Sequence, residues 1–296
     1  MNIELLKQLL MTQSVTFNQF RMFARIIREL SSMPGLLFKV LNGNIYVTKG
    51  QSDGYPAIVA HMDTVHDIVE DLSCLGVGKN ITGFNRVTMT QTGIGGDDKV
   101  GIFIALECLR AFDHLKVVFF RDEESGCFGS YEADHSFFED CNFILQPDRN
   151  GNSDFVVEIE GISLSSQDFQ DAVFPLFTEK GYKFSHGWMT DVMALKEEGV
   201  TCSVANISCG YYNPHTAQEY VNLDDVENCL GLIKGIITAY GDQRFPHIYH
   251  KPVWQFPSTT QTDPLGSLYC RDCWRPYPMA SGYCQECDSY YEQLVK

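Results

Sequence analysis

The sequence contains no hydrophobic run that could cross a membrane, since no stretch approaches the roughly 18 apolar residues that a spanning helix needs. The first ten residues carry Glu4 and Lys7 inside their apolar pattern, which differs from the order of a secretory signal peptide. Basic residues are also few: 22 Lys and Arg stand against 38 Asp and Glu, a formal net charge of -16. Because a polyanion would be repelled, we expect neither nucleic acid nor a membrane as a partner.

The sequence also lacks internal repeats, low-complexity tracts and the cysteine pattern of a disulfide-bonded protein. Seven of the 11 Cys are scattered singly, and the other four form two Cys-x-x-Cys pairs near the end. This usage suits a reducing compartment and a bound metal, so we expect a cytoplasmic protein. A hydrophobic fraction of 44% excludes a disordered or fibrous chain.

Helical and strand patterns alternate along most of the chain. Leucines at helical spacing over 5–10, and a capping box of Thr16 and Gln19 before an apolar stretch over 20–30, predict two opening helices. Apolar runs on both sides of an Asn-Gly pair over 36–48 predict a hairpin. Further predicted elements are strands at 57–60, 116–120, 142–145, 155–159 and 201–205, and helices at 101–109, 191–198 and 224–240. The alternation predicts an α/β fold, with a three-layer mixed sheet flanked by helices.

The chain divides into three predicted parts. Residues 1–243 would form the main domain, and the proline-punctuated segment 244–267 a linker or a strap across it. Residues 268–296 are too few for a core of their own, so a bound metal would supply most of their folding energy.

Two thiolate pairs, ten residues apart, lie in the last part of the chain. This spacing is typical of one structural zinc with four sulfur ligands, and the segment resembles a zinc ribbon. Its few basic residues favour a protein partner or self-association over nucleic acid. The four ligands would be Cys270, Cys273, Cys284 and Cys287.

Acidic and imidazole residues gather in five places, each after an apolar strand or in a glycine-rich loop. Singly, each is compatible with a turn, a helix cap or a solvated surface, but together they supply the ligands of a metal hydrolase. In His61-Met62-Asp63 the two polar side chains share one face of a strand end, so Asp63 could fix the tautomer of His61. The five places are His61-x-Asp63, Gly96-Asp97-Asp98-Lys99, Asp122-Glu123-Glu124, Asp148, and His215 with Glu219.

The order of these motifs over residues 57–220 resembles the co-catalytic di-zinc exopeptidase superfamily, and its tripeptide aminopeptidase (peptidase T) branch looks closest. The resemblance implies two catalytic metals, zinc or else cobalt or manganese, with a water bridging them. It implies that His61 and Asp148 bind one metal, that Glu124 and His215 bind the other, and that Asp97 bridges the two. Asp63 would orient His61, and Glu123 would be the general base.

The chain departs from this family in one respect. Many relatives insert a lid or dimerisation domain between the ligands that match Asp148 and His215, but only 66 residues intervene here. A residue that holds the substrate carbonyl would then have to be Tyr211, Tyr212 or His186, or come from another subunit. We leave that choice open.

Two smaller features of the sequence can be interpreted as either functional or purely structural. Thr190-Asp191 resembles a Ser/Thr-Asp step that precedes a helix in related aminopeptidases, but either residue could equally serve as a helix N-cap. His66, His114 and His135 are interpreted as surface or core histidines outside the ligand set.

The sequence thus predicts a metal-dependent hydrolase that cleaves an amide bond at the end of a small peptide or amino-acid conjugate. Aminopeptidase is the leading activity, and the alternatives within the superfamily are an N-acyl amino acid deacylase and a carboxypeptidase. The alternative from another class is a non-catalytic binding or scaffold protein that acts through the zinc ribbon.

Overall fold

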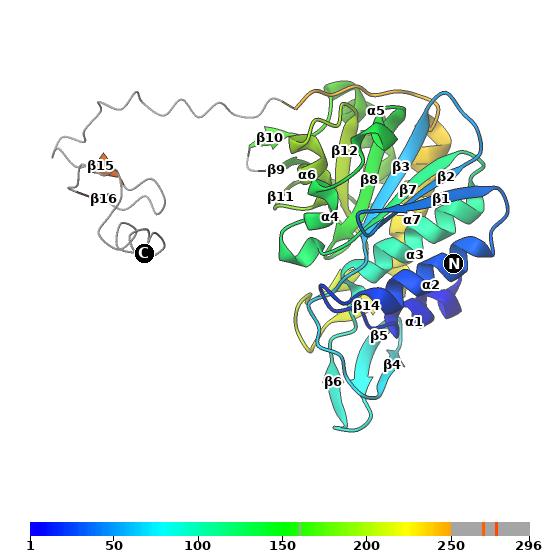
Figure 1. Ribbon diagram of the computed structural model, residues 1–296, viewed down its shortest axis with the longest axis vertical. Coiled ribbons are helices and arrows are strands. Elements are labelled where there is room, and N and C mark those ends of the chain that lie inside the picture. The colour runs from blue at the N-terminus through cyan, green and yellow to red at the C-terminus, as the bar shows by residue number, and fades with distance from the viewer. Residues whose placement is uncertain (160, 250–267, 270–275, 278–296) are drawn as a thin grey trace, which may run out of the picture. The chain divides into compact units, whose positions relative to one another are not determined.

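The computed structural model describes residues 1–159 and 161–249, together with the backbone of 268–269 and 276–277. Its larger unit, Met1–Tyr249, is built around a nine-stranded sheet (Figure 1). The strands of this sheet are β1 (Leu36–Leu41), β2 (Asn44–Lys49), β3 (Tyr55–His61), β7 (Leu115–Phe120), β8 (Cys141–Arg149), β9 (Asp154–Ile159), β10 (Ile162–Ser163), β11 (Lys183–Gly187) and β12 (Ser203–Ser208). They lie in the order β1-β2-β7-β3-β8-β12-β9-β10, and β11 also pairs with β9.

The sheet is parallel at its centre and antiparallel towards both sides. Strands β7, β3, β8 and β12 run in one direction, whereas β2 and β9 run against their neighbours β7 and β12. The hairpin of β1 and β2 closes with Leu41 opposite Asn44, as the Asn-Gly pair predicts. Central strands such as β3 and β7 are buried along their whole length, because helices cover both faces.

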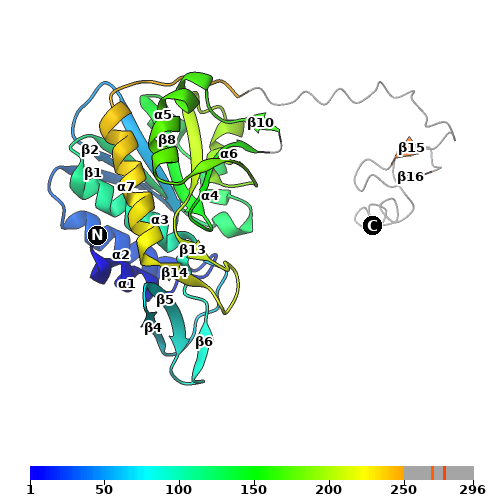
Figure 2. The ribbon, with the colours of Figure 1, turned by 180° about the vertical axis from the view of Figure 1, so that it is seen from behind.

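Helices lie on both faces of this sheet (Figure 2). On one face, α1 (Ile3–Leu10), α2 (Phe20–Ser31), α3 (Gly96–Ala111), α5 (Gln167–Glu179) and α7 (Leu223–Tyr240) share one apolar core with strand residues such as Ile58 and Val117. On the other face, α6 (Asp191–Glu197), with α4 (Phe128–Tyr131) beside it, covers residues such as Val59 and Val118. The two short 3-10 helices are η1 (Glu123–Ser125) and η2 (His135–Phe138). The predicted α/β fold with a mixed sheet flanked by helices is confirmed.

A second, smaller sheet projects from one end of the larger unit (Figure 1). It is formed by β4 (Leu72–Val77), β5 (Asn80–Asn85), β6 (Thr90–Thr92), β13 (Tyr211–Tyr212) and β14 (Tyr220–Asn222). The order is β13-β14-β5-β4, and β6 pairs with β5. This sheet, which the sequence did not predict, brings the 213–219 loop beside the segment that precedes Asp97.

The predicted capping box at the start of α2 is wrong. Helix α2 begins at Phe20, its N-cap is Gln19, and no side-chain bond caps it. Thr16 instead donates its hydroxyl to Oδ2 of Asp63, 2.9 Å away. A hydroxyl that donates to a buried carboxylate makes a charge-assisted hydrogen bond, so Thr16 serves the tertiary structure rather than the helix.

The described residues between Asp148 and His215 form β9 to β13 with α5 and α6, which belong to the two sheets and their helices. This part of the chain therefore contains no separate lid domain. Within the described residues, no helix is both long enough and apolar enough to span a membrane.

The main unit ends with a segment that follows α7 and lies beside the start of β12. Phe245 is buried, and its carbonyl oxygen accepts a hydrogen bond from the N–H of Ser203 at 2.8 Å. In the second unit, His250–Lys296, the antiparallel pair β15 (Leu268–Tyr269) and β16 (Pro276–Tyr277) is described. The division at residues 243 and 267 stays a prediction. The four ribbon ligands, Cys270, Cys273, Cys284 and Cys287, lie outside the described residues.

Candidate metal centre

Three of the candidate residues stand at the carboxyl ends of adjacent strands. His61 is the last residue of β3, Glu123 begins η1 just after β7, and Asp148 is the penultimate residue of β8. Because β7, β3 and β8 are parallel neighbours, their carboxyl ends meet at one edge of the sheet. The topology thus brings together residues that lie up to 87 positions apart.

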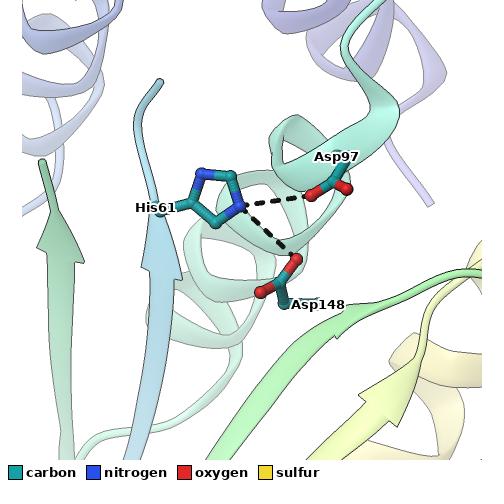
Figure 3. A group of neighbouring side chains, drawn as sticks. All are labelled: His61, Asp97 and Asp148. Carbon is teal, nitrogen blue, oxygen red and sulfur yellow. Dashed lines mark hydrogen bonds and ion pairs between the residues drawn. The ribbon is translucent and has the colours of Figure 1, made fainter. Parts of the chain in front are cut away.

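Two groups of potential metal-binding atoms form at this edge, and Asp97 belongs to both. In the first, Nε2 of His61 lies 3.2 Å from Oδ1 of Asp97 and 3.5 Å from Oδ1 of Asp148, and Figure 3 shows both carboxylates directed at this nitrogen. In the second, Nε2 of His215 lies 3.3 Å from Oδ2 of Asp97 and 3.1 Å from Oε2 of Glu124. Each oxygen of Asp97 therefore faces a different histidine.

Asp63 lies behind both groups and is fully buried. The backbone carbonyl oxygen of Asp63 lies 3.0 Å from Nδ1 of His61, the ring nitrogen that faces away from Asp97, and Oδ1 of Asp63 lies 3.5 Å from the same nitrogen. Its carboxylate also accepts the backbone N–H groups of Glu123, at 3.0 Å, and Glu124, at 3.3 Å. Asp63 thereby fixes the imidazole through its carbonyl oxygen and its carboxylate, and the carboxylate also fixes the turn that carries the two glutamates.

Glu123 faces the first group from the side of the β7 end. Its Oε2 is 3.9 Å from Nε2 of His61, and the thiol of Cys127 donates to its Oε1 at 3.6 Å. Glu124, by contrast, points at His215. The adjacent glutamates thus point to different places.

The start of α3, where Asp97 and Asp98 have non-helical backbone angles, places Asp97 in the cleft and buries Asp98. The carboxylate of Asp98 accepts the backbone N–H of His61 at 3.2 Å and of Gly101 at 2.9 Å. It therefore fixes the start of α3 against the end of β3. Gly95 has a φ of 66°, a conformation that favours glycine, and the Asp97–Asp98 peptide bond is cis. Of the two aspartates, only Asp97 lines the cleft.

Glu219, which follows His215 in the fifth motif and had no predicted role, supports the segment that carries Asp97. Glu219 is fully buried, and its carboxylate accepts the N–H groups of Ile94, Gly95 and Asp97. Nε2 of His66 lies 2.7 Å from the same carboxylate, so this histidine also supports the loop. Only the tertiary structure shows these contacts, because they join residues more than 120 positions apart.

Asp148 is held by side chains that sequence reasoning assigned to other roles or missed. Its Oδ2 accepts from Nε2 of Gln146 at 2.8 Å and from the hydroxyl of Thr190 at 3.1 Å, and the hydroxyl of Tyr211 lies 3.5 Å from its Oδ1. Thr190 occupies the N-cap position of α6 but makes no side-chain cap bond. Gln146 could have been found from the sequence, because it lies two residues before Asp148 and so faces the same side of the strand.

The three candidates for a carbonyl-binding residue have separate surroundings. Tyr211 lines the cleft. Tyr212 donates its hydroxyl to Asp225 at 2.7 Å and stacks on Tyr220, and His186 is exposed beside Glu158. Of the three, only Tyr211 lines the cleft, and the role itself stays a prediction.

The centre concentrates negative charge. The pKa of Asp148 is raised to about 7, first by burial and then by the nearby Asp97 carboxylate. Burial also raises the pKa of Glu123 well above its usual value, and Asp148 adds to this effect. The Asp97 and Glu124 carboxylates raise the pKa of His215 to about 10. A bound divalent cation would relieve this repulsion.

The residues present fit a pair of metal ions. Each group offers one imidazole nitrogen and two carboxylate oxygens that lie within 4.8 Å of one another. Oε1 of Glu124 is buried and has no hydrogen-bond partner in the described chain, so it is available to a cation. Mixed imidazole and carboxylate donors suit zinc, and also cobalt or manganese.

The groups open into a cleft of about 390 Å³. Its lining residues are Asp97, Glu123, Glu124, Gly126, Cys127, Asp148, Arg149, Asn150, Trp188, Met189, Thr190, Asn206, Tyr211, Pro214 and His215. This volume lies at the lower end of the range for small-ligand pockets, roughly 300–1,000 Å³.

Comparison with known proteins finds no matching family model and no matching curated protein. Solved structures do match. Aminopeptidase PepT from Bacillus cereus ATCC 10987 aligns with a TM-score of 0.63 at 13% identity, over 79% of this chain and 96% of its own. The TET1 peptidase of Pyrococcus horikoshii, which can assemble into a tetrahedron or a large octahedral shell, gives 0.59 at 16% identity, over 80% and 99%. An endoglucanase from Thermotoga maritima gives 0.55 at 13% identity, over 78% and 96%. The chain therefore shares the fold of the zinc exopeptidase-like proteins over about 80% of its length.

Proposed function

We propose that this protein is a di-metal hydrolase that cleaves an amide bond at the end of a small peptide or amino-acid conjugate. The observation that carries the proposal is the position of Asp97. Its two carboxylate oxygens face His61 at 3.2 Å and His215 at 3.3 Å, which is the arrangement of a carboxylate shared by two cations. The peptidases of the same fold support the choice of an amide substrate.

The residues divide into two sets of ligands in this proposal. His61 and Asp148 hold the first cation, Glu124 and His215 hold the second, and Asp97 bridges them. When bound, the two cations would polarise the scissile carbonyl and lower the pKa of water. Asp63 orients His61 through Nδ1, so that Nε2 is left free for the cation.

Glu123 is the general base in the proposed reaction. Its carboxylate lies beside His61 and lines the cleft, while Glu124 is directed at His215. Glu123 takes a proton from the attacking water and delivers it to the departing amine, because amide hydrolysis requires both transfers. Asp63 holds the backbone N–H of Glu123 and thereby keeps this carboxylate in place.

Aminopeptidase is the leading activity, by analogy with the named structures. Deacylation of N-acyl amino acids and carboxypeptidase activity use the same metal centre and are the alternatives. For the C-terminal residues we propose one structural zinc held by Cys270, Cys273, Cys284 and Cys287. This module is also the proposed surface for self-association or a protein partner.

The test of the proposed function is hydrolysis of small peptides by the full-length protein loaded with zinc, cobalt or manganese. We expect Glu123→Gln to lower kcat by roughly 10²–10⁴-fold while both metals are retained, because only the proton transfers are lost. Glu132→Gln is a matched control, since Glu132 lies on the exposed surface and pairs with Arg121. A fully metallated protein that cleaves no peptide, acyl-amino acid or conjugate would refute the proposal and favour the non-catalytic scaffold.

A further inference from the structure

One side of the cleft carries polar groups that have no place in the proposed metal centre. This side is formed by the ends of β8 and β12 and by the loop after β11, and it includes Arg149, Asn206, Trp188 and Met189. Arg149 is the only lysine or arginine among the described residues that line the cleft. We define Arg149 and Asn206 together as the side subsite.

The guanidinium of Arg149 is held in one orientation and still has an available edge. Its Nε donates to Oδ2 of Asp154 at 2.8 Å, and its Nη2 donates to the carbonyl oxygen of His186 at 3.1 Å. No hydrogen bond of Nη1 occurs within the part of the chain that the structure describes. A planar guanidinium that is fixed in this way is preorganised to bind a carboxylate.

Asn206 supplies the complementary acceptor. Asn206 is only 6% exposed and lines the cleft, and its Oδ1 is buried without a hydrogen-bond partner among the described residues. A buried carbonyl oxygen without a donor is unfavourable, so a donor on a bound molecule would find a site prepared for it. The side subsite therefore offers a donor for a carboxylate and an acceptor for an N–H group.

The side subsite lies about one residue from the proposed metal centre. Asn206 pairs in register with Gln146 on the neighbouring strand, and strands in a sheet are about 4.8 Å apart. Nε2 of Gln146 in turn lies 2.8 Å from Oδ2 of Asp148. Arg149 follows Asp148 directly in the chain. One residue of extended peptide spans about 3.5 Å, so a carboxylate bound here belongs to the residue next to the cleaved bond.

We infer that Arg149 and Asn206 bind the C-terminal residue that is released on hydrolysis, an inference that rests on the proposed function. Nη1 of Arg149 donates to the free α-carboxylate, and Oδ1 of Asn206 accepts from the N–H of the same residue. The substrate class is then dipeptides and amino-acid conjugates that carry a free α-carboxylate on the released residue. Blocking that carboxylate removes the charged contact, and lengthening the peptide on this side moves the carboxylate out of reach.

The first experiment needs only the unmodified, metal-loaded protein. It compares kcat/KM for alanyl-alanine, alanyl-alanine amide and alanyl-alanyl-alanine, the last assayed for release of its first residue. We expect the free dipeptide to exceed both others by roughly 10- to 100-fold, which is the range for one charge-assisted hydrogen bond. Equal rates on the free and amidated dipeptides would overturn the side subsite and leave the proposed hydrolase intact.

The second experiment replaces the cation together with its partner, so that no unpaired carboxylate remains. Arg149→Met with Asp154→Asn should lower kcat/KM for alanyl-alanine roughly 10- to 100-fold more than it lowers kcat/KM for the amide. The matched control is Arg86→Met with Asp71→Asn, an exposed arginine–aspartate pair on the smaller sheet that should change neither rate. A loss on both substrates alike would overturn the assignment.

A binding measurement separates the two proposals. Calorimetric titration of zinc-loaded Glu123→Gln protein with alanyl-alanine and its amide should show tighter binding of the free dipeptide, and the Arg149→Met, Asp154→Asn replacements should abolish the difference. If this discrimination is found but the unmodified protein cleaves nothing, the side subsite stands and the proposed hydrolase fails. If the dipeptide does not bind and is not cleaved, both fail.

Discussion

The carboxylate of Glu219 accepts a hydrogen bond from the backbone N–H of Asp97 at 3.2 Å, between residues 122 positions apart. The same carboxylate accepts from the N–H of Gly95 at 2.6 Å and lies 2.7 Å from Nε2 of His66. A single buried glutamate thus holds the loop on which both proposed metal sites depend. The backbone N–H groups that donate to Glu219 have no other acceptor among these contacts, so they would be left unpaired without this carboxylate.

Replacement of Glu219 by alanine should weaken both folding and metal binding. The change leaves buried N–H groups unpaired, so we expect the free energy of unfolding to fall by about 3 kcal/mol or more. Metal affinity should fall roughly 10- to 100-fold, since Asp97 loses its support. Urea unfolding and zinc titration measure the two effects. Glu227→Ala, at an exposed position on α7, is the control, and unchanged zinc affinity in the Glu219 variant would contradict the supporting role.

Replacement of Asp63 by asparagine tests the group that lies behind the centre. An amide cannot accept the N–H groups of both Glu123 and Glu124 through two oxygens, and it pairs less well with His61. We expect zinc affinity to fall roughly 10- to 100-fold in a competitive titration.

Thr16→Val provides a graded comparison for Asp63. It removes one hydrogen bond to the same carboxylate and should cost about 0.5–1.5 kcal/mol of stability, with a much smaller effect on zinc affinity. If the two variants weaken zinc binding equally, Asp63 acts through its general packing rather than through the imidazole.

Lys196 should contribute strongly to stability although it lies far from any proposed chemistry. It is fully buried, and its ammonium group donates to the carbonyl oxygens of Val200, Cys202 and His247 at 2.7–2.9 Å. Lys196→Met leaves these acceptors without their donor, and we expect a loss of about 3 kcal/mol or more in urea unfolding. Lys79→Met, at an exposed ion pair, should stay within about 0.5 kcal/mol of the unmodified protein. A small loss at Lys196 would mean that water replaces the donor.

The proposed zinc ribbon makes a separate prediction about metal content. Cys273→Ser together with Cys284→Ser should lower the zinc content by one ion per chain, because two of the four thiolate ligands are lost. Peptide hydrolysis and the two exchangeable metals should remain. Cys74→Ser, a half-buried free cysteine of the main unit, is the control. An unchanged zinc content would exclude the four-sulfur site.

Local patterns in the sequence were sufficient to predict main strands of the large sheet and the helices that cover it. The strand predicted at 116–120 is β7, the helix predicted at 224–240 is α7, and the Asn-Gly pair marks the turn between β1 and β2. The smaller sheet was missed because its short strands carry weak patterns. Its hairpins are local, but the pairing of β14 with β5, which unites them, joins residues more than 120 positions apart. The capping box failed for a related reason, since a distant carboxylate competes for Thr16.

The sequence by itself determined which residues could take part in metal chemistry, because residue type, order and position after apolar strands are local properties. Only the tertiary structure decided which of them meet: that Asp97 rather than Asp98 faces two histidines, and that Tyr211 rather than Tyr212 or His186 lines the cleft. Those outcomes depend on the pairing of parallel strands and on buried hydrogen bonds between residues far apart in the chain. Such contacts leave no periodic trace in the sequence, since each partner is chosen by the packing of the whole domain.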